Sequence, residues 1–153
     1  MKLLIVGDGT DKARLEELTT KLGLSEEVEF SGKVLPPDLY KIYSSGWVFA
    51  TASPIETQGM VLIEAAACGM PLIAVDKGAV SEVCQDGVNG VLCVDGDVEA
   101  MANAMVNILT DQKTREKFSG ASLKIASEHD LEKTLDKFIN IYQRVIKDSS
   151  ERV

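Results

Sequence analysis

Two glutamates, Glu56 and Glu64, lie eight positions apart in a stretch that is otherwise mainly apolar. This stretch, from residue 53 to residue 71, reads SPIETQGMVLIEAAACGMP, a loop-like start followed by an apolar run. A carboxylate in such a run is unfavourable unless it has a partner. Carboxylates accept hydrogen bonds from hydroxyl groups, and sugars and ribose offer hydroxyls in pairs. The two glutamates are therefore candidates for contacts with a ligand.

A helix is expected over residues 59–68, and its N-terminus adds a second chemical feature. The N–H groups of Gly59, Met60 and Val61 would have no partner within this helix. The helix dipole contributes about half a positive charge at the same place, and the two effects together suit a phosphate group. Glu56 and Glu64 would then flank a diphosphate, an arrangement that suits a nucleotide-sugar.

Each candidate also has an interpretation without a ligand. Glu56 could cap the helix or interact with its dipole, and Glu64 could be a solvated residue on an amphipathic helix. Residues 60–67 are apolar apart from Glu64 itself, which argues against solvation. Gly7-Asp8-Gly9 could be a tight turn that needs glycine, because Lys12 stands where a dinucleotide fingerprint needs its third glycine.

The elements that must hold these residues alternate along the chain. Strands are expected at residues 2–6, 27–30, 46–51, 71–75 and 90–94, and helices at 11–22, from about 35, and at 59–68, 79–85, 98–109, 113–128 and 131–146. The predicted fold class is α/β, with a doubly wound, Rossmann-like parallel sheet covered by helices and C-terminal helices. Trp47 and Phe49 are expected in its core. Ligands bind such sheets at the carboxyl ends of the strands, where the loops at 7–9, 31–34 and 52–59 lie.

Composition excludes several other classes of protein. The 153 residues are 45% hydrophobic and 26% charged, which suits one globular domain. No apolar run approaches the roughly 20 residues of a membrane span, and a net charge of −8 argues against a broad nucleic-acid-binding face. The widely spaced Cys68, Cys84 and Cys93 are expected to be buried free thiols rather than metal ligands.

The ordered set of motifs resembles family 4 of the retaining glycosyltransferases, which have the GT-B fold. Glu56-x7-Glu64, with Gly59 between and Ala67-x-Gly69-x-Pro71 after, matches the family signature, and shorter motifs match at residues 6–9, 28–32, 53–56 and 86–90. The resemblance covers nearly the whole chain. It implies a hexosyltransferase that moves a hexose from a UDP- or GDP-hexose to a glycan or lipid acceptor, without a metal or other cofactor.

The resemblance also implies roles for single residues. Glu56 would be the catalytic residue and would accept hydroxyls of the transferred hexose, whereas Glu64 would bind the donor ribose. The backbone of Gly59, Met60 and Val61 would meet the diphosphate. The remaining donor-site residues, which would border the cleft and line the base pocket, are Gly7, Gly9, Gly32, Val34 and Leu35.

The resemblance places residues 1–153 in the C-terminal, donor-binding half of such an enzyme, as a single nucleotide-sugar-binding domain. The first strand-and-helix unit of that half, which carries a basic Arg–Lys pair, and the N-terminal acceptor domain would lie outside this chain. The chain alone is therefore expected to bind a donor weakly and to transfer nothing. A cytoplasmic location is expected, with membrane association only for a full-length protein.

Two other functions stay open at this point. One is a GT-B relative with different chemistry, such as a nucleotide-sugar epimerase or a phosphorylase, which would need an acid/base pair or a cofactor-binding lysine near the cleft. The other is a non-enzymatic nucleotide-binding or flavodoxin-like signalling module, which would need clustered aspartates at the ends of the first and third strands. Asp8 follows the first strand, but the third ends at Thr51-Ala52.

Overall fold

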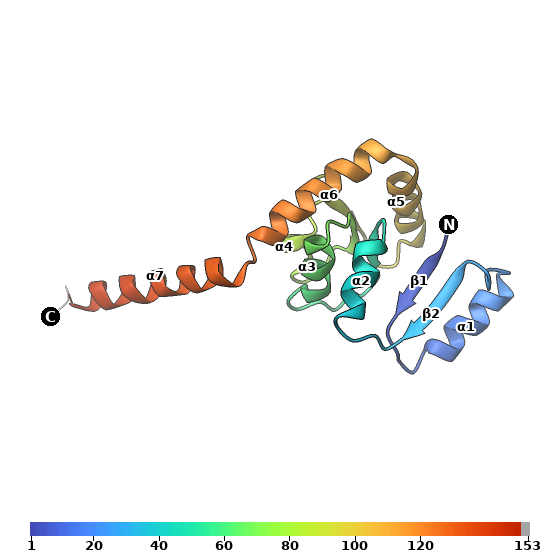
Figure 1. Ribbon diagram of the computed structural model, residues 1–153, viewed down its shortest axis with the longest axis horizontal. Coiled ribbons are helices and arrows are strands. Elements are labelled where there is room, and N and C mark those ends of the chain that lie inside the picture. Colours follow the sequence, from blue (N-terminus) through green and yellow to red (C-terminus); the bar gives the residue numbers. More distant parts are fainter. Residues whose placement is uncertain (151–153) are drawn as a thin grey trace. The chain divides into compact units, whose positions relative to one another are not determined.

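A computed structural model describes residues 1–150 of the chain, in which strands and helices alternate before three consecutive helices (Figure 1). The predicted elements are all found, and their ends differ by a few residues from the prediction. The strands are β1 (Leu3–Val6), β2 (Val28–Gly32), β3 (Phe49–Thr51), β4 (Leu72–Val75) and β5 (Gly90–Cys93). The helices are α1 (Lys12–Lys21), α2 (Asp38–Ser45), α3 (Met60–Ala67), α4 (Val80–Val83), α5 (Val98–Thr110), α6 (Gln112–Ser127) and α7 (Leu131–Ser150).

The chain divides into two compact units, the first covering Met1–Ile42 and the second beginning at Tyr43. In the first unit β1 and β2 pair in parallel, and in the second unit β4 lies between β3 and β5, again in parallel. The α/β class with parallel strands and C-terminal helices is therefore confirmed. In the described part of the chain these strands make two separate sheets, whereas the sequence predicted one.

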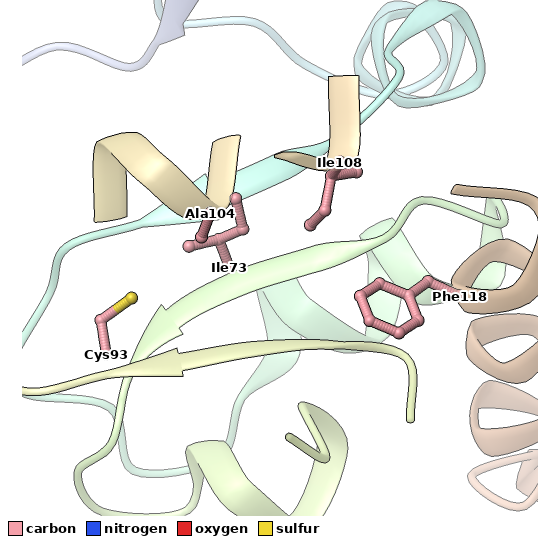
Figure 2. Packing of buried hydrophobic residues seen from close by; sticks show 5 residues of the cluster. All are labelled: Ile73, Cys93, Ala104, Ile108 and Phe118. Atoms are coloured by element: carbon pink, nitrogen blue, oxygen red, sulfur yellow. The ribbon is translucent and has the colours of Figure 1, made fainter. Parts of the chain in front are cut away.

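The core of the second unit is built around β4, whose four residues are all buried. Ile73 packs in a cluster with Cys93 of β5, Ala104 and Ile108 of α5 and Phe118 of α6 (Figure 2). Neighbouring residues of a strand point to opposite faces of the sheet. Leu72 and Ala74, which flank Ile73, are also fully buried, so both faces of this strand are covered, as the sequence predicted.

The expected cover on both faces does not hold for β1. This strand is as apolar as β4, yet Leu3, Leu4 and Val6 are exposed to 49%, 38% and 38%. Strand β4 has a neighbour on each edge, whereas β1 pairs with β2 alone among the described residues. Apart from β2, no described element packs extensively against β1, so its side chains stay exposed.

The placement of Trp47 in the core was also wrong. Strand β3 begins only at Phe49, so Trp47 lies before it and is 60% exposed. The Arg115 guanidinium of α6 lies 4.5 Å from the centre of the indole ring, a cation–π contact that partly shields it.

A buried polar network explains the motif at residues 86–90. Asn89 is fully buried, and its side chain accepts a hydrogen bond from the Gln85 N–H at 2.8 Å and donates to the Val83 carbonyl at 3.0 Å. It also donates to Ser122 Oγ at 3.3 Å, and that hydroxyl donates to the Met70 carbonyl at 2.7 Å. A buried amide needs such partners. Through them, Asn89 connects the segment before β5 to helix α6.

Helix α7 has an apolar stripe that includes Leu131, Leu135, Phe138 and Tyr142, all of which are exposed. This spacing of four, three and four residues places them on one side of the helix. Among the described residues, no helix is both long and apolar enough to cross a membrane.

Candidate functional site

The loop between β3 and α3 carries Glu56, and several hydrogen bonds fix its conformation. The Ser53 hydroxyl donates to the Ile55 carbonyl at 2.9 Å and accepts from the Ile55 N–H at 3.3 Å. The Glu56 carbonyl accepts a hydrogen bond from the Ala79 N–H at 3.2 Å. The loop that follows β4 therefore fixes the backbone of Glu56.

Gly78 belongs to the same contact. Its φ of +61° is left-handed, and a Cβ at this position would collide with the Glu56 carbonyl oxygen. The sequence did not predict this contact with Glu56. A glycine three residues after the end of β4 was the only available signal, and a glycine in a loop does not identify its partner.

The Glu56 carboxylate bonds to the backbone directly before α3. Its Oε1 atom accepts hydrogen bonds from the Gly59 N–H at 2.9 Å and from the Gln58 N–H at 3.2 Å. These backbone donors, Gly59 first and then Gln58, lower the pKa of Glu56 below its ordinary value of 4.5. Glu56 therefore lies beside the start of α3 without capping the N–H groups of the helix itself, and its contact with a hexose stays a prediction.

Gly59 is required by the backbone at the start of α3. Its φ is +66°, a left-handed conformation that favours glycine, and a Cβ there would lie 3.5 Å from Val83 Cγ2. Gly59 itself is buried. The next two residues of the helix are accessible, because Met60 is 53% and Val61 is 38% exposed. The first turn of α3 can therefore be reached from solvent.

Glu64 is half-buried on α3, next to the fully buried Ala65 and Ala66. The Tyr43 hydroxyl of α2 donates a hydrogen bond to its Oε2 atom at 3.2 Å. A carboxylate in apolar surroundings needs a hydrogen-bond partner, and the Tyr43 hydroxyl is such a partner for Glu64. The sequence did not predict this contact.

The other predicted site residues lie in the first unit. The Gly7 N–H donates to the Gly32 carbonyl at 2.9 Å, which joins these two glycines at the carboxyl ends of β1 and β2. Val34 is half-buried and Leu35 is 64% exposed. The Gly9 N–H donates to Asp8 Oδ1 at 3.0 Å, which is the turn geometry considered as an alternative for this segment.

A lysine that was not predicted as a site residue lies at this edge of the first unit. The Lys12 ammonium would be 4.0 Å from a Cβ built on Gly32. Lys12 was considered only because it replaces a glycine of the dinucleotide fingerprint. Its position adds a cation beside the residues that were predicted to form the base pocket.

Two of the three cysteines lie in the core. Cys84 and Cys93 are buried free thiols, as predicted, whereas Cys68 is half-buried. Burial raises the pKa of Cys84 to about 12, so this thiol is protonated at neutral pH. Within residues 1–150, no group of three His, Cys, Asp or Glu side chains could hold a metal ion.

A hollow of about 430 Å³ lies elsewhere on the second unit, at the amino ends of β3 and β4. It is lined by Trp47, Pro71 and Arg115 among others, and by none of the predicted site residues. Parallel α/β sheets bind their ligands at the opposite, carboxyl ends of the strands, which is where Glu56 lies.

Comparison with known proteins gives the family. Residues 1–124 match the family described as glycosyl transferases group 1. The chain is 31% identical over 148 residues to N-acetyl-alpha-D-glucosaminyl L-malate synthase of Bacillus anthracis, which covers 96% of this chain and 38% of that protein. It is also 31% identical over 142 residues to the sulfoquinovosyl transferase SQD2 of Arabidopsis thaliana, covering 91% of this chain and 27% of that protein. The chain thus spans less than half the length of these relatives.

Solved structures of glycosyltransferases have the same fold. The pneumococcal O-GlcNAc transferase GtfA, in complex with UDP and GlcNAc, matches 95% of this chain and 30% of its own, with a TM-score of 0.81 and 25% identity. Anabaena HepE in complex with UDP-glucose matches 98% of this chain and 41% of its own, with a TM-score of 0.77 and 26% identity. The chain belongs to the glycosyl transferases group 1 family, the family 4 type of glycosyltransferase with the GT-B fold.

Proposed function

We propose that this chain is the donor-binding part of a retaining glycosyltransferase and that its second unit binds a nucleoside diphosphate-hexose at the N-terminus of α3. One observation carries the proposal. The accessible first turn of α3 lies between two glutamates, Glu56 in the preceding loop and Glu64 on the helix itself. Backbone N–H groups can hold the diphosphate, and carboxylates can accept from the hydroxyls on either side of it.

Each part of the donor has an assigned partner in this proposal. The N–H groups of Gly59, Met60 and Val61 face the diphosphate, Glu64 takes the ribose hydroxyls, and Glu56 takes hydroxyls of the hexose. As the bond to the hexose breaks, negative charge grows on the diphosphate. Fixed N–H groups and the helix dipole stabilise that charge better than water does. No metal is assigned a role.

The related structures favour a uridine nucleotide as the first ligand to test. GtfA is described with UDP and HepE with UDP-glucose. We propose a UDP-hexose as the donor that the second unit binds. A glycan or lipid acceptor is assigned to sequence beyond this chain, because the relatives are more than twice as long.

Titration calorimetry with UDP and GDP tests the proposal on the chain and on Glu64→Ala. A hydrogen bond to a charged group contributes about 1.5–3 kcal/mol, so the Glu64→Ala variant should bind UDP roughly tenfold to a hundredfold more weakly. Glu82→Ala, which removes an exposed glutamate from α4, is the matched control and should bind like the unchanged chain. Equal UDP affinity for Glu64→Ala and the unchanged chain would contradict the ribose role. A chain that binds neither nucleotide would contradict the proposal as a whole.

A further inference from the structure

We propose that Tyr43 is a positioning residue of the donor site, which holds the Glu64 carboxylate in the orientation that accepts the ribose hydroxyls. This inference rests on the proposed function, because it explains how Glu64 would perform its part. Tyr43 lies on α2, 21 positions before Glu64, and no motif in the sequence connects the two residues.

The hydrogen bond between these residues has a clear direction. The Tyr43 hydroxyl donates to Glu64 Oε2 at 3.2 Å. An ionised carboxylate is an acceptor only, with two oxygens and about four lone-pair directions. The tyrosine occupies one direction at Oε2, which leaves Oε1 and the remaining direction at Oε2 for a vicinal pair of hydroxyls.

The ring of Tyr43 is itself held in place. Tyr43 is only 7% exposed, and its ring centre lies 5.9 Å from that of Phe49 on β3, with 59° between the planes. A tilted pair of this kind is a favourable aromatic contact. The hydroxyl is therefore presented to Glu64 by a side chain that is anchored in the core.

The benefit of such an anchor is pre-organisation. A free glutamate side chain samples several rotamers and loses this freedom when it binds a ligand. Since Tyr43 already restricts Glu64, less freedom is lost when the ribose binds. A tyrosine in this role affects the recognition of ribose and leaves the recognition of phosphate unchanged.

The test uses Tyr43→Phe, which keeps the aromatic ring and removes the hydroxyl. UDP, 2′-deoxy-UDP and inorganic pyrophosphate are titrated against residues 1–153 with and without the substitution. Tyr43→Phe should weaken UDP binding roughly threefold to tenfold, the effect of losing one hydrogen bond. It should also reduce the preference for UDP over 2′-deoxy-UDP and leave pyrophosphate affinity unchanged. Tyr40→Phe on the same helix, where Tyr40 is 47% exposed, should change none of these affinities.

Other outcomes would overturn the inference. If Tyr43→Phe keeps the full preference for UDP over 2′-deoxy-UDP, Tyr43 does not position Glu64. If Tyr43→Phe weakens the binding of all three ligands equally, the role of Tyr43 is structural only. The double variant Tyr43→Phe/Glu64→Ala gives an independent check, because a residue that acts through Glu64 causes no further loss once Glu64 is gone. An additive loss would contradict the proposal.

The same titrations separate this inference from the proposed function. If Glu64→Ala binds UDP as tightly as the unchanged chain, the ribose role of Glu64 is wrong, and the role of Tyr43 falls with it. If Glu64→Ala is weakened and Tyr43→Phe is not, the donor site stands and only the positioning role is wrong.

Discussion

Glu56 and a phosphate group would compete for the same hydrogen-bond donor. The Gly59 N–H, which the proposal assigns to the diphosphate, is bonded to the Glu56 carboxylate in the structure. A carboxylate beside a phosphate also repels it. In the proposed complex, Glu56 would have to release the Gly59 N–H, and the hydroxyls of the hexose would give its carboxylate new partners.

We predict that Glu56→Ala separates the recognition of phosphate from the recognition of sugar. Without the carboxylate, UDP should bind about twofold to fivefold more tightly, the size of a single interaction with a helix terminus. The added affinity that UDP-glucose gains over UDP should disappear at the same time. Titration calorimetry with both ligands measures this, and Glu82→Ala serves again as the control. Weaker binding of UDP by Glu56→Ala would show that Glu56 does not compete with the diphosphate.

The candidate site residues could be chosen from the sequence, but their partners in the structure could not. Glu56, Gly59 and Glu64 stand out because of their types and spacing in one continuous stretch. Tyr43 and Gly78 reach the same site from α2 and from the loop after β4. Such contacts depend on how the elements pack, and a pattern of residue types along the chain does not contain that information.

The loop that carries Glu56 is held by the loop after β4. The Ala79 N–H bonds to the Glu56 carbonyl, and Gly78 lies against the same carbonyl. The two loops follow β3 and β4, which are neighbours in a parallel sheet, so their carboxyl ends meet at one edge. The position of Glu56 is therefore set by the next strand and loop as well as by its own.

We predict that Gly78→Ala weakens the binding of UDP-glucose, because the new Cβ pushes the Glu56 backbone away. Gly87→Ala is the matched control, since Gly87 has a similar φ of +68° but no atom within 4 Å of the point that a Cβ would occupy. Both variants should lose stability from backbone strain at a positive φ, and Gly78→Ala should lose more because of the collision with Glu56. Only Gly78→Ala should lose donor affinity in calorimetry. Equal affinities for the two variants would show that Gly78 has no influence on Glu56.

The strands and helices were predicted well from the sequence, and the residues that were placed wrongly have physical explanations. Runs of apolar residues predicted the strands, and β4 is buried on both faces as expected. Trp47 belongs to such a run but lies before β3 and stays 60% exposed. Its contact with Arg115 of α6 joins residues that are far apart in the sequence, and apolar periodicity alone could not predict it.

At the scale of the whole molecule, α7 contributes little to stability. Its apolar side chains are exposed, with 70% at Leu131, 50% at Leu135, 53% at Phe138 and 66% at Tyr142. Helix α6 differs, because Phe118 and Ser122 are buried in the second unit. The sequence predicted both helices but not this difference, which depends on whether a helix packs against the sheet.

We predict that a chain ending at Asp130, without α7, keeps the thermal unfolding midpoint within about 2 °C of the full chain, since exposed residues usually contribute little. A chain ending at Thr110, which also lacks α6, should unfold at a much lower temperature, because it loses buried contacts. Circular dichroism during heating measures both. A large fall in the midpoint on removal of α7 alone would contradict this interpretation.

Backbone amide chemical shifts of the whole chain, recorded while UDP is added, give the most direct test of the donor site. The account predicts that the largest changes occur at Gly59, Met60 and Val61, with smaller changes around Glu64. Changes concentrated at the hollow lined by Trp47 and Arg115, with none at the start of α3, would contradict it.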